Sequence, residues 1–341
     1  MKEGLFMSKV IIKKDYKSKL NLIETEIAIK FVKDTFEREL AKALNLTRVS
    51  APLFVLPETG LNDDLNGYER PVSFDIHDLK KNVQIVQSLA KWKRNALRRY
   101  GFSVGSGLYT DMNAIRRDEE LDNFHSVYVD QWDWERIINK ENRNMTFLKQ
   151  IVKKIYKAIC TTQTKVIKKY PVLSNKLPKD IKFIKSTDLY KMYPDKTPKE
   201  RETLICKEYG AVFISQIGWP IDGKEPHDGR AADYDDWKLN GDILVYFEVL
   251  DCALELSSMG IRVDKESLTS QTGFKKEYAK LSSPYSQDIL HDRLPLTIGG
   301  GIGQSRLCMF MLNKMHVGEV QSSLWTDEDM NILNENKIEI L

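Results

Sequence analysis

Carboxylates are concentrated in one stretch of the sequence, where five aspartates fall within the fifteen residues from Asp228 to Asp242. Burying so many carboxylates without a cation is too costly, so they are either solvated or face cations. Tyr234, Trp237 and Gly241 are interleaved with them, which favours a pocket wall over a solvated loop. Such a wall predicts carboxylates that hold Mg²⁺ or an ammonium group.

The apolar segment 254–263 carries an acid and a base seven residues apart, Glu255 and Arg262. Strand alternation places Glu255 and Ser257 off the apolar face, and a kink at Gly260 adds Arg262 to them. An ordinary half-exposed strand explains the pattern equally well. The alternative is that the two charges serve opposite ends of a charged substrate.

Four glycines from Gly299 to Gly303 precede Arg306 and an apolar run typical of a helix. This is not the dinucleotide fingerprint, because no glycine stands three residues after Gly303, and no G-K-[ST] follows as in a P-loop. A plain glycine turn is the simpler interpretation. Glycines beside a guanidinium at the start of a helix favour a polyphosphate or a stacked purine.

Further upstream, Arg116 and Arg117 begin a charged loop that leads into the segment 124–135. Alternation in that segment puts Gln131 and Asp133 on one face, which predicts a polar pocket rather than core. His125 lacks metal-ligand spacing, as does His227, and both are interpreted as structural or supporting groups. Asp63 is a turn former, and Lys93 a surface lysine, when each is considered alone.

The elements that must position these groups follow from periodicity. Apolar residues at helical spacing predict helices over 23–44 and from 146 to about 168, the first with Ile27 on its apolar face. Short apolar segments predict strands at 127–129, 211–214, 243–247 and 254–263. The segment 48–55 predicts a short edge strand, because Pro52 cannot donate to a ladder. No regular βαβ alternation is present. The expected fold is α+β, a largely antiparallel sheet flanked by helices, with an N-terminal extension (1–22) before one domain (23–341).

Composition limits the classes of protein. The 341 residues include 52 Lys+Arg and 49 Asp+Glu, a net charge of +3, and 42% are hydrophobic. Disorder and a strongly basic nucleic-acid binder are therefore not expected. No apolar run approaches the roughly 20 residues of a membrane span, and no secretory signal is visible. Four widely spaced cysteines exclude a zinc knuckle and fit a reducing cytoplasm. We expect a cytoplasmic protein without nucleic-acid or membrane partners.

Several long segments together resemble the ammonia-dependent asparagine synthetases of the A type, aspartate–ammonia ligases built on the class II aminoacyl-tRNA synthetase fold. The resemblance covers about residues 30–325 and rests on LAKWKR (89–94), HSVYVDQWDWE (125–135), DYDDW (233–237), LNGDILV (239–245), ELSSMGIRVD (255–264) and TIGGGIGQSRL (297–307).

The resemblance implies roles for the three class II motifs. The first helix and the segment 48–54 resemble motif 1, which forms a homodimer interface in that family. Arg116, chosen over Arg117 from the register of the acids that follow, resembles the motif 2 arginine that holds the α-phosphate of ATP. Arg306 resembles the motif 3 arginine on the adenine and γ-phosphate side.

The resemblance also implies a complete site. The aspartate and ammonia pocket would be lined by Asp63, Ser88, Lys93, Gln131, Asp133 and Arg262. The nucleotide would contact Arg116, Asp235, Asp242, Glu255, Ser258 and Arg306, with Mg²⁺ held by Asp242 and Glu255. The implied catalytic residues are Asp63, Arg116 and Arg306.

The implied reaction has two steps. The β-carboxylate of aspartate attacks the α-phosphorus of ATP to give β-aspartyl adenylate and pyrophosphate, and ammonia then displaces AMP to give asparagine. Asp63 is the candidate general base, because ammonium must lose a proton before it attacks. Lys2 stands where amidotransferases with an N-terminal nucleophile need cysteine, so free ammonia is the expected nitrogen donor.

Three alternatives are set against this interpretation. A tRNA synthetase would need an anticodon-binding module of about a hundred residues, whereas only about twenty precede the first helix. A shortened paralogue that modifies a protein or another acceptor would share the fold but not ammonia-dependent AMP release. A non-catalytic amino-acid sensor would be expected to lose Arg116, Glu255 or Arg306, and all three are present.

Overall fold

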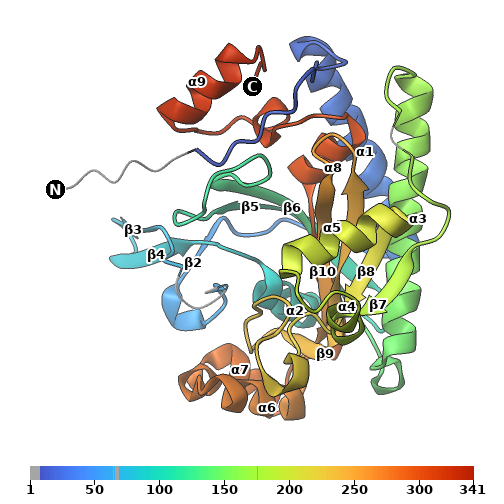
Figure 1. Ribbon diagram of the computed structural model, residues 1–341. Helices are drawn as coiled ribbons and strands as arrows, with labels where there is room; N and C mark the ends of the chain where they lie inside the picture. The colour runs from blue at the N-terminus through green and yellow to red at the C-terminus, as the bar shows by residue number, and fades with distance from the viewer. Residues whose placement is uncertain (1–7, 64, 66–68, 175) are drawn as a thin grey trace.

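The computed structural model describes residues 8–63, 65, 69–174 and 176–341. Its centre is an eight-stranded sheet (Figure 1). The strand order is β1 (Leu46–Arg48), β5 (Gly107–Ile115), β6 (Tyr128–Ile137), β11 (Thr297–Gly303), β10 (Cys252–Arg262), β9 (Asp235–Phe247), β8 (Ala211–Ser215) and β7 (Lys182–Lys185). The inner pairs are antiparallel, whereas β1–β5 and β7–β8 at the two edges are parallel. The predicted α+β fold with a largely antiparallel sheet is confirmed.

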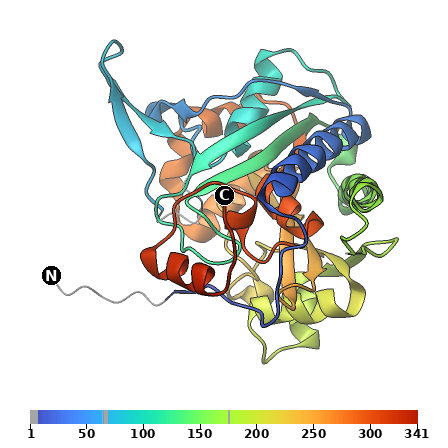
Figure 2. The same cartoon turned by 90° about the horizontal axis from the view of Figure 1, so that it is seen from above.

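One face of the sheet is covered by α1 (Leu22–Leu44), α3 (Met145–Lys169) and α8 (Gln304–Met311) (Figures 1 and 2). Asn21 begins α1 with a capping box, because its side chain accepts from the N–H of Glu24 while the Glu24 carboxylate accepts from the N–H of Asn21. Trp132 and Trp134 of β6 are fully buried on this face, and Phe36 of α1 packs against Trp132. This layer holds the main apolar core.

On the opposite face, two helices of the described chain cover the two sides of the sheet. α2 (Ala90–Arg99) packs on β5 and β6, and α5 (Pro198–Tyr209) packs on β8, β9 and β10. Between them the middle of the sheet carries polar side chains, so that face can border a cavity. The remaining helices are α4 (Ser186–Met192), α6 (Lys265–Lys275), α7 (Pro284–Leu290) and α9 (Asp327–Glu335), and β2 (Phe54–Val55), β3 (Ser73–Ile76) and β4 (Lys81–Ile85) form a smaller sheet.

The two predicted helices are present, and the four predicted strands coincide with parts of β6, β8, β9 and β10, although residues 127 and 263 fall outside the strands. The prediction of one strand over 48–55 is wrong. β1 ends at Arg48 and β2 begins at Phe54, with Pro52 in the non-strand connection between them. The prediction that Ile27 lies on the apolar face of the first helix is also wrong, because 55% of its surface is exposed.

The described part of the N-terminal extension packs on the C-terminal part of the chain. Val10, Ile12 and Tyr16 contact an apolar cluster built around Met315 and Leu333. Figure 2 shows this segment running beside the C-terminal region before it enters α1. Among the described helices, none combines the length and the apolar character needed to span a bilayer.

Candidate active site

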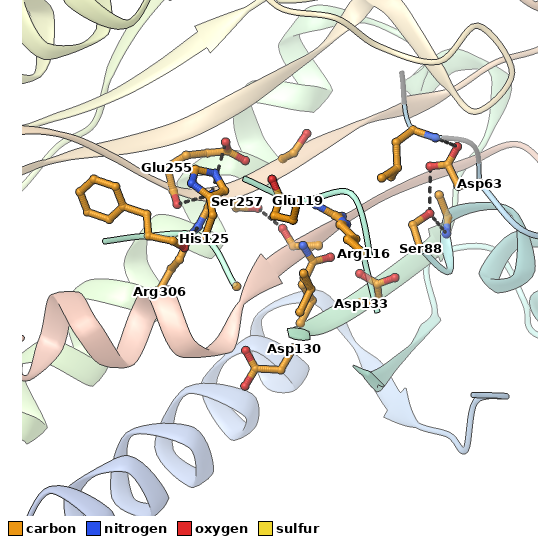
Figure 3. Close-up of a pocket in the computed structure, with 18 of the residues that line it drawn as sticks. Asp63, Ser88, Arg116, Glu119, His125, Asp130, Asp133, Glu255, Ser257 and Arg306 are labelled. Carbon is orange, nitrogen blue, oxygen red and sulfur yellow. Dashed lines mark hydrogen bonds and ion pairs between the residues drawn. The ribbon is translucent and has the colours of Figure 1, made fainter. Parts of the chain in front are cut away.

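A cavity of about 590 Å³ opens at the uncovered middle of the sheet, between α2 and α5. With the exception of Asp242, the residues predicted from the sequence line this cavity: Asp63, Ser88, Lys93, Arg116, Gln131, Asp133, Asp235, Glu255, Ser258, Arg262 and Arg306. They come from segments far apart in the chain. In Figure 3, Asp63 and Ser88 lie at one end of the cavity, Glu255 and Arg306 lie at the other, and Arg116 lies between them.

Arg262 is the fixed charge at one end of the cavity. Its Nε lies 3.0 Å from Oε1 of Glu135, its Nη2 lies 2.8 Å from Oε2, and its Nη1 contacts the carboxylate of Asp235. All three side chains are almost completely buried. Burial opposes the charge of Arg262, but the two carboxylates outweigh it and raise its pKa. The guanidinium is therefore held rigidly in its charged form.

Lys93 is a buried lysine rather than a surface one. Its Nζ donates to the carbonyl of Gly300 at 2.9 Å and lies 3.3 Å from Oδ2 of Asp133. Burial lowers the pKa of this lysine, while Asp133 opposes that shift. The first turn of α2 thus brings a cation to the cavity floor beside an acid of β6.

Two glycines of β11, Gly299 and Gly301, are explained by the side chains of the neighbouring strand β6. A Cβ on Gly299 would lie 1.8 Å from Oε2 of Glu135, and one on Gly301 would lie 2.3 Å from Oε1 of Gln131. The cluster is therefore a central strand whose missing side chains leave room for polar groups, rather than a glycine turn. As predicted, Arg306 lies in the first turn of the helix that follows.

Asp63 and Ser88 form a hydrogen-bonded pair at the cavity. Ser88 Oγ donates to Oδ2 of Asp63 at 3.0 Å, and the N–H of Leu65 donates to Oδ1 at 3.1 Å. Asp63 is 3% exposed. Its oxygens are thus oriented by neighbours while the residue still borders the cavity.

The structure separates the two adjacent arginines of the motif 2-like loop. Arg116 is partly buried, borders the cavity and has Nη1 3.8 Å from Oε2 of Glu119. Arg117 is exposed and does not line the cavity. Of the two guanidiniums, the one that borders the cavity therefore belongs to Arg116, the arginine chosen from the sequence.

Arg306 and Glu255 form the second charged end. Nη1 of Arg306 lies 3.6 Å from Oε2 of Glu255, and both side chains are about a quarter exposed (24% and 28%). Burial alone would raise the pKa of Glu255, but Arg306, Lys199 and Arg230 outweigh it and lower the pKa. The carboxylate is therefore charged at neutral pH.

Asp242 lies behind this end instead of lining it. One of its oxygens pairs with Arg230, while Oδ1 is buried without a hydrogen-bond partner. Burial raises its pKa to about 7, and Glu255 and Asp228 add to the rise against Arg230. A buried oxygen without a partner and a second carboxylate nearby fit a Mg²⁺ ion, which uses one or two carboxylates together with water and phosphates. No group of three metal-ligating side chains occurs in the described ranges.

Sequence reasoning missed three charged groups at the site: Arg230 and Lys199 line the cavity, and Glu135 lies behind it against Arg262. Glu135 follows from the alternation that identified Gln131 and Asp133, extended by one step along β6. Arg230 stood within the recognised acidic stretch but received no role, although it joins Asp228 to Asp242. Lys199 of α5 also lines the cavity, and no pattern in its local sequence indicates this.

Asp235 lies apart from the other residues of the predicted nucleotide set. The resemblance assigned Asp235 to the nucleotide set, but Asp235 contacts Arg262. It pairs opposite Arg262 in the β9–β10 ladder, whereas Asp242 pairs opposite Ser258 nearer the Glu255 end. Asp235 therefore belongs to the Arg262 end of the cavity.

Solved structures with the same fold confirm the class II synthetase core. An asparaginyl-tRNA synthetase of Pyrococcus horikoshii in complex with asparaginyl-adenylate superposes with a TM-score of 0.64 at 14% identity, over 89% of this chain and 70% of that one. The asparaginyl-tRNA synthetase of Entamoeba histolytica, also with asparaginyl-adenylate, gives 0.62 at 14% identity, over 88% and 66%. At this identity the likeness shows the fold.

Relatives in sequence are much closer. An aspartate–ammonia ligase of Clostridium perfringens (strain SM101) is 59% identical over 336 residues, which is 98% of this chain and 100% of the relative. One of Lactiplantibacillus plantarum is 57% identical over 317 residues, 93% of this chain and 98% of the relative. The model of the aspartate-ammonia ligase family matches residues 23–337. The chain is therefore an enzyme that belongs to the aspartate–ammonia ligase family.

Proposed function

We propose that this enzyme makes L-asparagine from L-aspartate, free ammonia and ATP through a β-aspartyl adenylate, with release of pyrophosphate and AMP. The observation that carries the proposal is that one continuous cavity has two charged ends with Arg116 between them (Figure 3). The Arg262 end suits a small dianionic amino acid, and the Arg306 end suits a nucleotide. Family membership supports the overall conversion.

The Arg262 end would hold aspartate by charge. Arg262 and Lys93 supply cations for its carboxylates, while Asp133, Asp235 and Gln131 supply acceptors for its ammonium group. Because Glu135 and Asp235 fix Arg262, the binding group is oriented before the substrate arrives. The β-carboxylate would then point along the cavity toward Arg116.

The first step needs positioning and charge stabilisation rather than an enzyme nucleophile. Arg116 would contact the α-phosphate, and Arg306 would lie along the adenine and γ-phosphate, with Glu255 and Ser258 beside the nucleotide. Both guanidiniums stabilise the charge that spreads over the phosphate oxygens as the anhydride forms. Mg²⁺, held by Asp242 and Glu255, would further neutralise the phosphates.

The second step needs a proton acceptor. Ammonium has no free lone pair, so a proton must leave before nitrogen attacks the adenylate carbonyl. Asp63 borders the cavity at the aspartate end, and Ser88 and the N–H of Leu65 orient its carboxylate. We assign it as the general base.

A homodimer is part of the proposal. Large apolar side chains are exposed on the motif 1-like region: Ile23 and Ile27 on α1, and Leu53 and Phe54 at the start of β2. A second copy packed there would cover them. The four cysteines are free thiols, which supports a reducing cytoplasmic compartment.

The experiment is a product assay with purified enzyme, aspartate and Mg·ATP, run with ammonium, with glutamine, and with neither. Of these three reactions, only the one with ammonium should give AMP and asparagine, and it should give them in equal amounts. Product with glutamine but not with ammonium would contradict the assigned nitrogen donor. AMP that appears only when tRNA or a protein acceptor is added would favour a synthetase-like paralogue instead.

A further inference from the structure

The N-terminal segment, residues 8–16, lies outside the range matched by the family model and contacts the loop that borders the cavity. This pocket loop, residues 116–127, joins β5 to β6. Eight of its residues line the cavity: Arg116, Asp118, Glu119, Glu120, Asp122, Phe124, His125 and Ser126. The segment and the loop are far apart in sequence but adjacent in the structure.

The contact is centred on Asn123, which is 1% exposed. The N–H of Ile11 donates to Oδ1 of Asn123 at 2.6 Å, and Nδ2 of Asn123 donates back to the carbonyl of Ile11 at 3.0 Å. Nδ2 also donates to the carbonyl of Met315 at 3.0 Å, and the carbonyl of Asn123 accepts from the N–H of Val317 at 2.8 Å. One amide side chain thus joins the pocket loop to two other parts of the chain.

The residues that flank Asn123 face the nucleotide end of the cavity. Asp122 accepts from the N–H groups of Phe124 and His125 at 2.7 and 2.8 Å, which fixes the local turn. The carbonyl of Phe124 lies 3.5 Å from Nε of Arg306. Figure 3 shows His125 beside Glu255 and Arg306. The position of Asn123 therefore sets the wall against which a nucleotide would lie.

The N-terminal segment is itself anchored. Tyr16 donates to Oε2 of Glu319 at 2.8 Å, Ser8 donates to Oδ1 of Asp329 at 2.6 Å, and the N–H of Lys13 lies 3.3 Å from Sδ of Met315. The apolar side chains of Val10 and Ile12 pack on the cluster around Met315. A segment held at several points can hold the loop in turn.

We propose that the N-terminal segment is a positioning element for ATP, which clamps the pocket loop through the paired hydrogen bonds between Ile11 and Asn123. The proposal rests on the assignment of the Arg306 end to the nucleotide. Its consequence is selective, because loosening the loop should weaken the binding of ATP, while the Arg262 end, built from β6, β9 and β10, should still bind aspartate.

The test compares two substitutions at one position. Ile11→Pro removes the donated N–H and keeps the carbonyl, whereas Ile11→Ala keeps both backbone groups and removes a side chain that is 61% exposed. Ile11→Pro should raise the KM for ATP by about 3- to 10-fold, the range expected for one lost hydrogen bond. The KM for aspartate and the values for Ile11→Ala should stay within about twofold of the unmodified enzyme.

Hydrogen exchange supplies a readout that does not depend on activity. The amides of Phe124 and His125, which are bonded within the loop, should exchange at least about 10-fold faster in Ile11→Pro than in Ile11→Ala. If Ile11→Pro does not fold, a chain without residues 2–12, which keeps Tyr16, takes its place. Unchanged exchange together with an unchanged KM for ATP would overturn the proposal. Faster exchange with no ligase activity in the unmodified enzyme would instead count against the proposed function.

Discussion

Glu135 holds Arg262 through both carboxylate oxygens, with Nε 3.0 Å from Oε1 and 3.1 Å from Oε2 and Nη2 2.8 Å from Oε2. Thr297 adds a hydrogen bond to Oε1 at 2.6 Å. The pair is buried at the cavity floor, where a bidentate contact fixes both the charge and the plane of the guanidinium. The orientation of the cavity end that we propose for aspartate therefore depends on an acid that the substrate need not touch.

Two substitutions of Glu135 should separate its effect on aspartate binding from its effect on the stability of the fold. Glu135→Gln keeps the shape but loses the charge, so Arg262 is held less firmly and the KM for aspartate should rise about 10-fold or more. The KM for ATP should change little. Glu135→Ala leaves a buried guanidinium short of a partner and should destabilise the fold by about 3–5 kcal/mol. Steady-state kinetics and urea unfolding check the two results, and equal effects on both KM values would contradict the assignment.

The glycine opposite Glu135 gives a second prediction. Gly299→Ala places a methyl group 1.8 Å from Oε2 of Glu135, so the strand or the carboxylate must move. We expect a loss of about 1–3 kcal/mol in the free energy of unfolding, typical of overpacking. Gly303→Ala is the matched control on the same strand, because the nearest neighbour of its new Cβ would be the Arg306 side chain, at 3.3 Å. Similar unfolding curves for the two variants would contradict this explanation of the glycine.

The two neighbouring arginines should differ sharply in their effect on catalysis. Arg116→Ala should reduce kcat/KM by about 10²- to 10³-fold, the usual loss when one group that stabilises transition-state charge is removed. Arg117→Ala is the control, because Arg117 is exposed and away from the cavity, and should stay within about threefold of the unmodified enzyme. The rate of AMP formation measures the loss of activity in both variants. A larger loss for Arg117→Ala would reverse the assignment.

Asp63 can be tested by separating the two chemical steps. Asp63→Asn keeps a similar shape but cannot accept the proton, so aspartate-dependent exchange of pyrophosphate into ATP should persist within about 10-fold. Asparagine formation should slow by about 10²-fold or more. Ser88→Ala removes one hydrogen bond to Asp63 and should cost about 10-fold or less. Equal losses in exchange and in asparagine formation would show that Asp63 acts before the second step.

His316 makes stability depend on pH. Burial lowers its pKa from 6.5 to about 4, its Nδ1 accepts from the N–H of Gly318 at 3.0 Å, and its ring packs on Trp325. The unfolded chain therefore binds more protons between these pH values, so this stabilisation is complete above about pH 6.5 and is lost as the pH falls toward 4. The loss between pH 7 and pH 5 should be about 2 kcal/mol.

His316→Asn provides the control for that effect, because its side-chain oxygen can still accept from Gly318 but does not titrate. Urea unfolding of both proteins at pH 7 and pH 5 makes the comparison. The unmodified enzyme should lose more stability than His316→Asn over this interval. Parallel losses would assign the pH dependence to other groups.

Much of the fold follows from apolar patterning, and the failures have a common physical cause. The sheet is apolar on its helix-covered face but polar where it borders the cavity, so polar stretches such as 235–240 belong to long strands without an apolar signature. Tertiary pairing, rather than local propensity, makes them strands. The break between β1 and β2 differs, because Pro52 lies in the connection between two edge strands that belong to different sheets.

The candidate site could be predicted only as far as its residues stand in recognisable segments. Alternation brought Gln131 and Asp133 together, and the same rule reaches Glu135. Spacing cannot reveal that Arg262 of β10 meets Glu135 of β6, because β11 lies between those strands in the sheet. The link from Ile11 to Asn123 likewise exists only in the folded chain.

The most direct test of the proposed chemistry follows the oxygen atoms of aspartate. The enzyme is given aspartate labelled with ¹⁸O in the β-carboxylate, together with Mg·ATP and ammonium, and the phosphorus products are examined by ³¹P NMR. A β-aspartyl adenylate predicts that AMP carries one ¹⁸O from the carboxylate, with unlabelled pyrophosphate. Label in inorganic phosphate accompanied by ADP would show a β-aspartyl phosphate instead and would contradict the account.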